Sequence, residues 1–157
     1  MEKLMSLFEG FDIEKIGDLL PSAETLMNGL SKWMVLLVLV GPLLMVGFGI
    51  YYWFFAPKEA NYYFGYRCMF GMGSVEAWRF TQRLAGIVWT VLGLVLTGFM
   101  VLCSGKLVDM EVYDAIWTGA KYVLWEVGLV IVSSIFINTM VMSQFTYDGE
   151  YRKEKRR

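Results

Sequence analysis

Apolar residues gather in three long blocks, and all of the charged residues but one lie outside these blocks. The blocks cover residues 33–55, 84–102 and 123–145, and the single internal charge is that of Glu126. A helix needs about 20 apolar residues to cross the hydrocarbon part of a bilayer. Because lipid offers no partner to free backbone N–H and C=O groups, each block predicts a transmembrane helix.

The composition supports a membrane protein and not a soluble domain. Of the 157 residues, 57% are hydrophobic and 18% are charged, whereas a soluble domain has about 45–50% apolar and about 25% charged residues. We therefore expect an all-α integral membrane protein whose three transmembrane helices lie within residues 31–145. The acidic segment at residues 1–30 predicts a further amphipathic helix, ended by Pro21. It would lie in the membrane interface or pack against the outer ends of the spans.

Lysine and arginine are concentrated in the loop at residues 56–83 and in the tail at residues 146–157. These basic residues are Lys58, Arg67, Arg79, Arg83, Arg152, Lys153, Lys155, Arg156 and Arg157. The loop between the second and third blocks has fewer basic residues and several acidic ones. Because basic residues accumulate on the cytoplasmic side, this pattern predicts a cytoplasmic loop and tail and an external N-terminus. We expect contact with the lipid bilayer and no nucleic-acid partner.

The types of residue present exclude several kinds of chemistry. The chain has no histidine, and its two cysteines, Cys68 and Cys103, lie far apart. Histidine is the commonest general base and metal ligand, and paired cysteines would be needed for a thiolate metal site. Neither a paired-carboxylate motif nor a nucleophile elbow is present. We therefore expect neither an enzyme nor a cofactor or metal site.

The first loop and the start of the second apolar block are dense in aromatic, amide and arginine side chains, which a plain connector would lack. Ser74 is a candidate N-cap for a helix that places Arg79 and Arg83 four residues apart. Trp78 and Gln82 share a neighbouring face at the same spacing. One interpretation is a site for an anionic group. The other is anchoring at headgroup depth by tryptophan and snorkelling arginines.

Polar or small residues also occur inside the apolar blocks. Glu126 is either a functional group within the membrane or a side chain that reaches the outer interface. Asn138 is expected to bond a neighbouring helix, and Pro42 is expected to kink its own. A stripe of small residues predicts a packing face within this chain or a homodimer seam. The stripe consists of Gly86, Thr90, Gly93 and Thr97.

The motif Asn-x-x-Phe-Gly-Tyr-Arg, followed by a serine and by Trp-x-Phe, resembles the SdpI family of bacterial multi-span membrane proteins. The matching positions are Asn61, Phe64, Gly65, Tyr66, Arg67, Ser74, Trp78, Phe80, Gln82 and Gly86. The resemblance implies toxin immunity or membrane-localised signalling in the bacterial cytoplasmic membrane. It also implies a peptide toxin or a cytoplasmic regulator as the partner. With Arg79 added, it suggests a binding surface on the cytoplasmic loop.

Two other functions are compatible with the residues themselves. A small transport or permeation component would use Pro42, Glu126 and Asn138 to line a path after oligomerisation. A structural subunit of a larger membrane complex is the other alternative, because three helices bury little surface among themselves.

Overall fold

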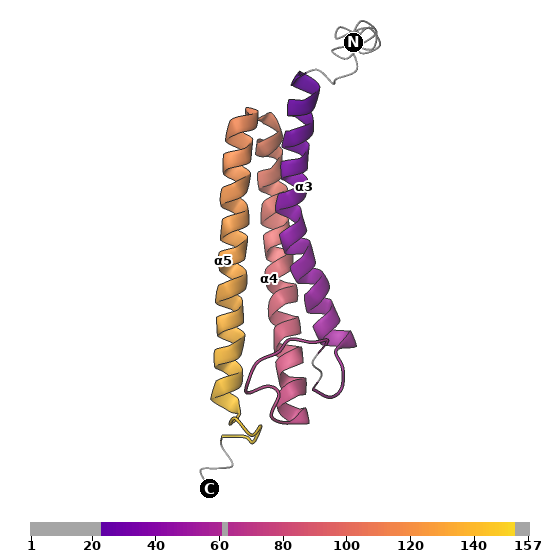
Figure 1. Ribbon diagram of the computed structural model, residues 1–157, viewed down its shortest axis with the longest axis vertical. Helices are drawn as coiled ribbons and strands as arrows, with labels where there is room; N and C mark the ends of the chain where they lie inside the picture. Colours follow the sequence, from indigo (N-terminus) through magenta and orange to yellow (C-terminus); the bar gives the residue numbers. More distant parts are fainter. Residues whose placement is uncertain (1–22, 61–62, 153–157) are drawn as a thin grey trace, which may run out of the picture.

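The computed structural model describes residues 23–60 and 63–152. Its described part consists of three long helices that stand side by side (Figure 1), a short π-helix, and the loops that join them. In chain order, the elements are α3 (Ala23–Ile50), η1 (Tyr51–Phe55), α4 (Val75–Asp109) and α5 (Val112–Gln144). The segments Lys32–Phe55, Val75–Asp109 and Val112–Gln144 are long and apolar enough to cross a membrane. This confirms the predicted all-α fold with three candidate transmembrane helices.

Both helices after the first loop are longer than the apolar blocks inside them. The α4 helix begins at Val75, nine residues before its apolar block, and the predicted N-cap is confirmed because the Ser74 hydroxyl accepts a hydrogen bond from the Ala77 N–H at 3.1 Å. The loop predicted at residues 56–83 is therefore confined to residues 56–74. The predicted helix ending at Pro21 lies outside the described residues, whereas residues 23–30 form the start of α3.

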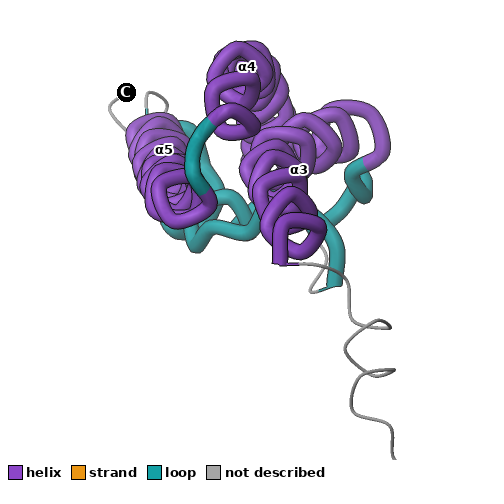
Figure 2. The backbone as a smooth tube through the Cα atoms, turned by 90° about the horizontal axis from the view of Figure 1, so that it is seen from above, coloured by secondary structure: helices purple, strands orange, loops and turns teal. Residues whose placement is uncertain are grey.

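The three helices contact one another in every pairing, and they occupy the corners of a triangle when seen along the bundle (Figure 2). The α3 and α4 helices approach most closely through the small-residue stripe. A Cβ atom on Gly86 would lie 2.8 Å from the Trp53 nitrogen, and one on Gly93 would lie 3.0 Å from the Pro42 oxygen. The stripe is therefore a packing face within the chain, as the first of the two interpretations predicted.

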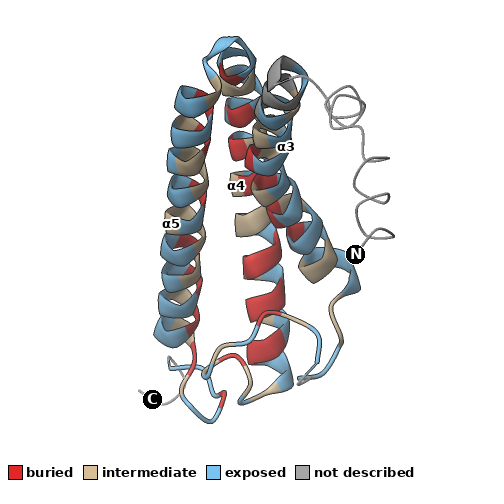
Figure 3. Ribbon diagram, turned by 45° about the horizontal axis from the view of Figure 1, so that its top comes forward, coloured by how far each residue is buried: buried red, intermediate tan, exposed pale blue. Residues whose placement is uncertain are grey.

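Burial is confined to the inner sides of the helices, and Figure 3 shows it concentrated along α4. Large apolar side chains cover the outer surface, as exposed fractions of 79% for Leu102 and 71% for Trp125 illustrate. A soluble protein rarely exposes such a continuous apolar surface. Lipid contact accounts for it, because hydrocarbon chains solvate these side chains as well as a protein core does.

We predict that Gly93→Ala lowers the thermal stability of the protein in detergent micelles. The added methyl group meets the backbone of α3, and overpacking of this kind costs about 1–3 kcal/mol. The matched control is Gly98→Ala on the same helix, because nothing lies within 4 Å of its added Cβ atom. It should be neutral or slightly stabilising, since alanine favours helix over glycine by about 1 kcal/mol. Equal melting temperatures for the two variants would contradict the proposed close contact.

Candidate functional site at the loop end of the bundle

The side chain of Gln82 holds the middle of the first loop against α4. Gln82 is 3% exposed, and its Oε1 accepts a hydrogen bond from the Tyr66 N–H at 2.8 Å. Its Nε2 donates to the Tyr66 carbonyl at 2.7 Å. The side-chain amide therefore satisfies both backbone groups of Tyr66, much as a neighbouring strand would. Buried backbone groups need such partners, so this pair fixes the position of the loop.

The Tyr66 side chain connects this loop to the rest of the bundle. Its hydroxyl lies 3.2 Å from the Ser134 carbonyl and 3.3 Å from Asn138 Oδ1, and its single proton can be donated to either acceptor. Its ring packs edge-on against Tyr52 and Trp89. Burial raises the pKa of Tyr66, which keeps the hydroxyl a donor. Asn138 was expected to bond a neighbouring helix, but its partner is this loop tyrosine.

Trp78 is buried inside the site and does not serve as an anchor at the membrane surface. It is fully inaccessible, and its Nε1 donates to the Pro57 carbonyl at 2.7 Å. The ring lies so close to Gly65 that a Cβ atom there would sit 2.7 Å from two of its carbons. Gly65 also has a φ of +111°, which side chains disfavour. For Trp78, the anchoring interpretation is therefore wrong, because the loop folds back over the indole.

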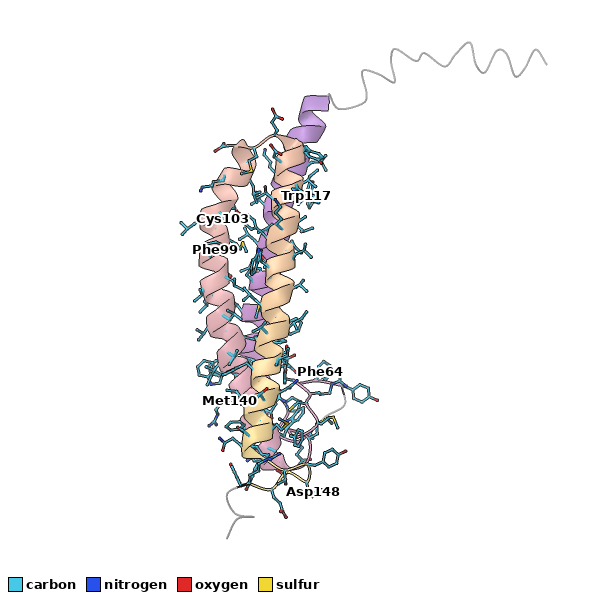
Figure 4. All side chains as sticks on the ribbon, turned by 90° about the vertical axis from the view of Figure 1, so that its left-hand side faces the viewer. Phe64, Phe99, Cys103, Trp117, Met140 and Asp148 are labelled. Carbon is cyan, nitrogen blue, oxygen red and sulfur yellow. The ribbon has the colours of Figure 1, made fainter. Side chains whose placement is uncertain are left out.

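The residues after α5 close this end of the bundle. The Ser74 hydroxyl donates to the Gly149 carbonyl at 2.9 Å, and Gly149 adopts a φ of +79°. Phe145 and Tyr151 form an isolated antiparallel bridge around this turn. The sequence analysis missed this closure, although the Asp148-Gly149 pair is a recognised turn signal. Figure 4 shows Asp148 at the same end of the bundle as the first loop.

Arg67 lies at a pocket of about 600 Å³ between the loop and the C-terminal half of α5. The walls are mainly apolar and rich in methionine, and they include two polar side chains from α5. The lining residues are Arg67, Cys68, Met69, Phe70, Met72, Ile135, Asn138, Thr139 and Met142. The pocket therefore combines a guanidinium group with deformable thioether side chains.

The other predicted arginine belongs to a different and smaller pocket, of about 150 Å³. There Arg79 lies with Lys58, Arg83 and Gln82 near η1. The predicted binding residues thus do not form one surface. Gly65, Tyr66, Trp78 and Gln82 support the loop from inside, whereas Phe64 is 61% exposed at its outer edge (Figure 4). Asn61 lies outside the described residues.

The two intramembrane candidates also differ in their surroundings. Glu126 is 5% exposed, and a Cβ atom on Gly41 of α3 would collide with its Oε2. It is therefore buried against α3 and is not directed to the outer interface. Asn138 lies three turns further along α5, beside the loop. Within residues 23–60 and 63–152, no cluster of three or more cysteine, aspartate or glutamate side chains could hold a metal ion.

A single protein-family model covers most of the first loop, α4 and α5. The model of the SdpI/YfhL protein family matches residues 58–143, which is more than half of the chain. The chain belongs to the SdpI/YfhL family. The match extends the resemblance from the loop motif to the whole unit of loop, α4 and α5. No curated protein and no solved structure matches the chain.

We predict that Gln82→Ala releases the loop and exposes Cys68. The thiol is half-buried with its Sγ 4.0 Å from Thr81 Oγ1, and burial raises its pKa. Less of it is therefore the reactive thiolate at neutral pH. The loss of Gln82 leaves the Tyr66 backbone unpaired at a cost of about 1–3 kcal/mol for each group. Alkylation of Cys68 by a maleimide at pH 7 should become several-fold faster.

The measurement uses a Cys103→Ser background, so that Cys68 is the only thiol. Arg83→Ala is the matched control, because Arg83 is the exposed neighbour of Gln82 on the same helix. Its alkylation rate should equal that of the parent protein. An unchanged rate in Gln82→Ala would show that the amide does not hold the loop.

Proposed function

We propose that this SdpI/YfhL family protein confers immunity to a membrane-active peptide toxin, which it binds through its first loop. The observation that carries the proposal is the pocket between this loop and α5, where Arg67 stands at the edge of a methionine-rich wall. Methionine side chains adapt to irregular apolar partners, and arginine pairs with carboxylates. An amphipathic peptide with an acidic group or a free C-terminus matches both features.

The position of the pocket supports a partner that arrives through the membrane. Its α5 wall belongs to a candidate transmembrane helix, and its other wall is the loop that lies at the end of the bundle. Ile135 and Met142 extend the apolar surface that faces lipid on this helix. A peptide inserted into the bilayer beside α5 would reach the pocket without leaving the membrane. A cytoplasmic regulator held at the membrane, as in signalling, is the variant of this proposal in which the partner arrives from the water side.

We predict that the wild-type chain protects a toxin-sensitive bacterium against a peptide encoded beside its own gene. Arg67→Ala should weaken this protection about tenfold in lethal dose, which corresponds to ~1.4 kcal/mol of binding free energy. Arg79→Ala is the matched control, because it removes the same charge from the other pocket. Survival that is equal for wild type and empty vector, across all neighbouring peptides, would refute the immunity proposal. Equal protection by the wild type and by Arg67→Ala would refute the role of this pocket.

We also propose that the loop and the tail face the cytoplasm of a bacterial cell and that the N-terminus lies outside. Support comes from the end of the bundle at which the basic residues collect. The first loop packs there against the residues after α5, through the Ser74–Gly149 hydrogen bond and the ring contact of Phe70 with Tyr147. Lys58 and Arg67 belong to this loop, and Arg152 belongs to the segment after α5. The opposite turn between α4 and α5 carries Asp109 and Glu111.

This orientation predicts the behaviour of two fusions at the C-terminus of the full chain. A fluorescent protein that matures only in the cytoplasm should fluoresce, and alkaline phosphatase, which is active only outside, should be inactive. Fusions of the same two reporters to a membrane protein of known orientation provide the control. Active phosphatase with a dark fluorescent fusion would reverse the proposed orientation.

Permeation remains the second candidate function, and the burial of Glu126 is the observation that favours it. The path expected from sequence is interrupted, however. Pro42 adjoins Gly41, which contacts Glu126, but Asn138 lies three turns away and is engaged with Tyr66. A flux assay in liposomes would test it, with Glu126→Gln as the variant that should abolish any flux.

A further inference from the structure

Glu126 lies inside the apolar part of the bundle, three residues after the start of its apolar block and five residues after Lys121. It contacts α3 at Gly41, which is nine residues from Lys32, or about 13 Å along a helix. On α4, no charged residue occurs between Arg83 and Lys106. The hydrocarbon part of a bilayer is about 30 Å thick. At the level of Gly41, the carboxyl group therefore lies within this layer, buried on the inner side of α5.

The described residues offer the Glu126 carboxyl group few polar partners. Its Oε1 is buried and makes no hydrogen bond with the described residues. Lys121 is the nearest cation on α5, but its Nζ lies 5.9 Å from the ring centre of Trp117, towards the beginning of the helix. The other titratable groups in this part of the bundle are Tyr122, one turn away on the same helix α5, and Cys103 of the facing helix α4, which lies against Tyr122. Between Lys32 and the π-helix, α3 presents none.

These surroundings favour a neutral carboxyl group. An ionised carboxylate without a counter-ion is expensive in a low-dielectric medium, and in practice such a group binds a proton instead. Gly41 provides the space that the group occupies, because any larger residue would collide with Oε2. The contact is therefore built into the packing of α3 and α5.

We propose that Glu126 is a proton-binding site between α3 and α5, within the membrane. The site is independent of the toxin-binding pocket at the loop. Release of the proton would leave a charge that must be hydrated, so α3 must separate from α5 when the proton leaves. Pro42, next to the contact, supplies no N–H to the preceding turn and weakens α3 at this level. Proton binding is thereby coupled to the packing of these two helices.

The test uses dicyclohexylcarbodiimide, an apolar reagent that partitions into the bilayer and reacts with protonated carboxyl groups. The O–H of the acid adds across one C=N bond of the reagent, and the acyl group then migrates to nitrogen to give a stable N-acylurea, with no atom lost. Full-length protein in phosphatidylcholine liposomes is treated at pH values from 5 to 10, and the modified residue is located by peptide mass spectrometry. A water-soluble carbodiimide serves as the control for exposed carboxyl groups such as Asp114.

We expect Glu126 to be modified by the apolar reagent and protected from the soluble one. The rate should fall about tenfold for each pH unit once the carboxyl group ionises. Modification of other carboxyl groups but not of Glu126, in folded protein, would overturn the proposal. So would a rate that stays constant from pH 5 to pH 10, because the proton would then never leave.

Two glycine variants link the chemistry to the contact with α3. Gly41→Ala fills the space of the carboxyl group, displaces it towards the lipid and should accelerate its modification several-fold. Gly47→Ala on the same helix meets nothing within 4 Å and should react like the wild type. Equal rates in all three proteins would overturn the role of the contact.

An infrared measurement distinguishes the proton site from a purely structural residue. Above about pH 6, where exposed carboxyl groups are ionised, the C=O stretch of a protonated carboxyl group should remain in the wild type, disappear as the pH rises further, and be missing in Glu126→Gln. This variant is neutral and has the same shape, so it should keep the fold, as checked by gel filtration. A wild-type spectrum that matches that of Glu126→Gln throughout would overturn the proposal. The outcome does not depend on whether Arg67→Ala affects toxin protection.

Discussion

The loop end of this protein depends on one reciprocal pair of hydrogen bonds, between the Gln82 amide and the backbone of Tyr66. A loop that packs against transmembrane helices cannot leave its N–H and C=O groups unpaired, since neither apolar side chains nor lipid can replace water. One side-chain amide supplies a donor and an acceptor at the spacing that a peptide group requires. The Tyr66 ring and hydroxyl can then reach between α4 and α5, and the pocket beside Arg67 forms around this fixed point.

The residues that carry the family motif therefore have two distinct physical roles. Tyr66, Trp78 and Gln82 are buried, Gly65 packs against the Trp78 ring, and together they shape the loop. Arg67 is exposed and lies among methionine side chains that can rearrange.

Much of the fold follows from the sequence, because three apolar blocks of sufficient length leave helices as the only structure that satisfies the backbone. The Ser74 cap and the Gly86–Gly93 packing face are equally local signals. The site was harder to predict. Tryptophan is a residue type typical of interfacial anchors. Trp78 is instead a buried donor to the Pro57 carbonyl, because the loop folds back over its ring. Contacts between residues distant in sequence, such as Ser74 and Gly149, carry no periodicity that could reveal them.

The buried polar groups of the bundle differ in whether they have hydrogen-bond partners, and this difference separates Glu126 from the groups near the loop. Near the loop, Tyr66, Gln82 and Asn138 satisfy one another or the backbone, so they stabilise one arrangement. Glu126 has a glycine cradle but no partner for its Oε1 among the described residues. A group that served packing alone would be replaced without loss by an apolar residue of similar volume. A carboxyl group at this position adds something that no apolar residue can, namely the ability to gain and lose a proton beside Pro42, which interrupts the hydrogen bonding of α3.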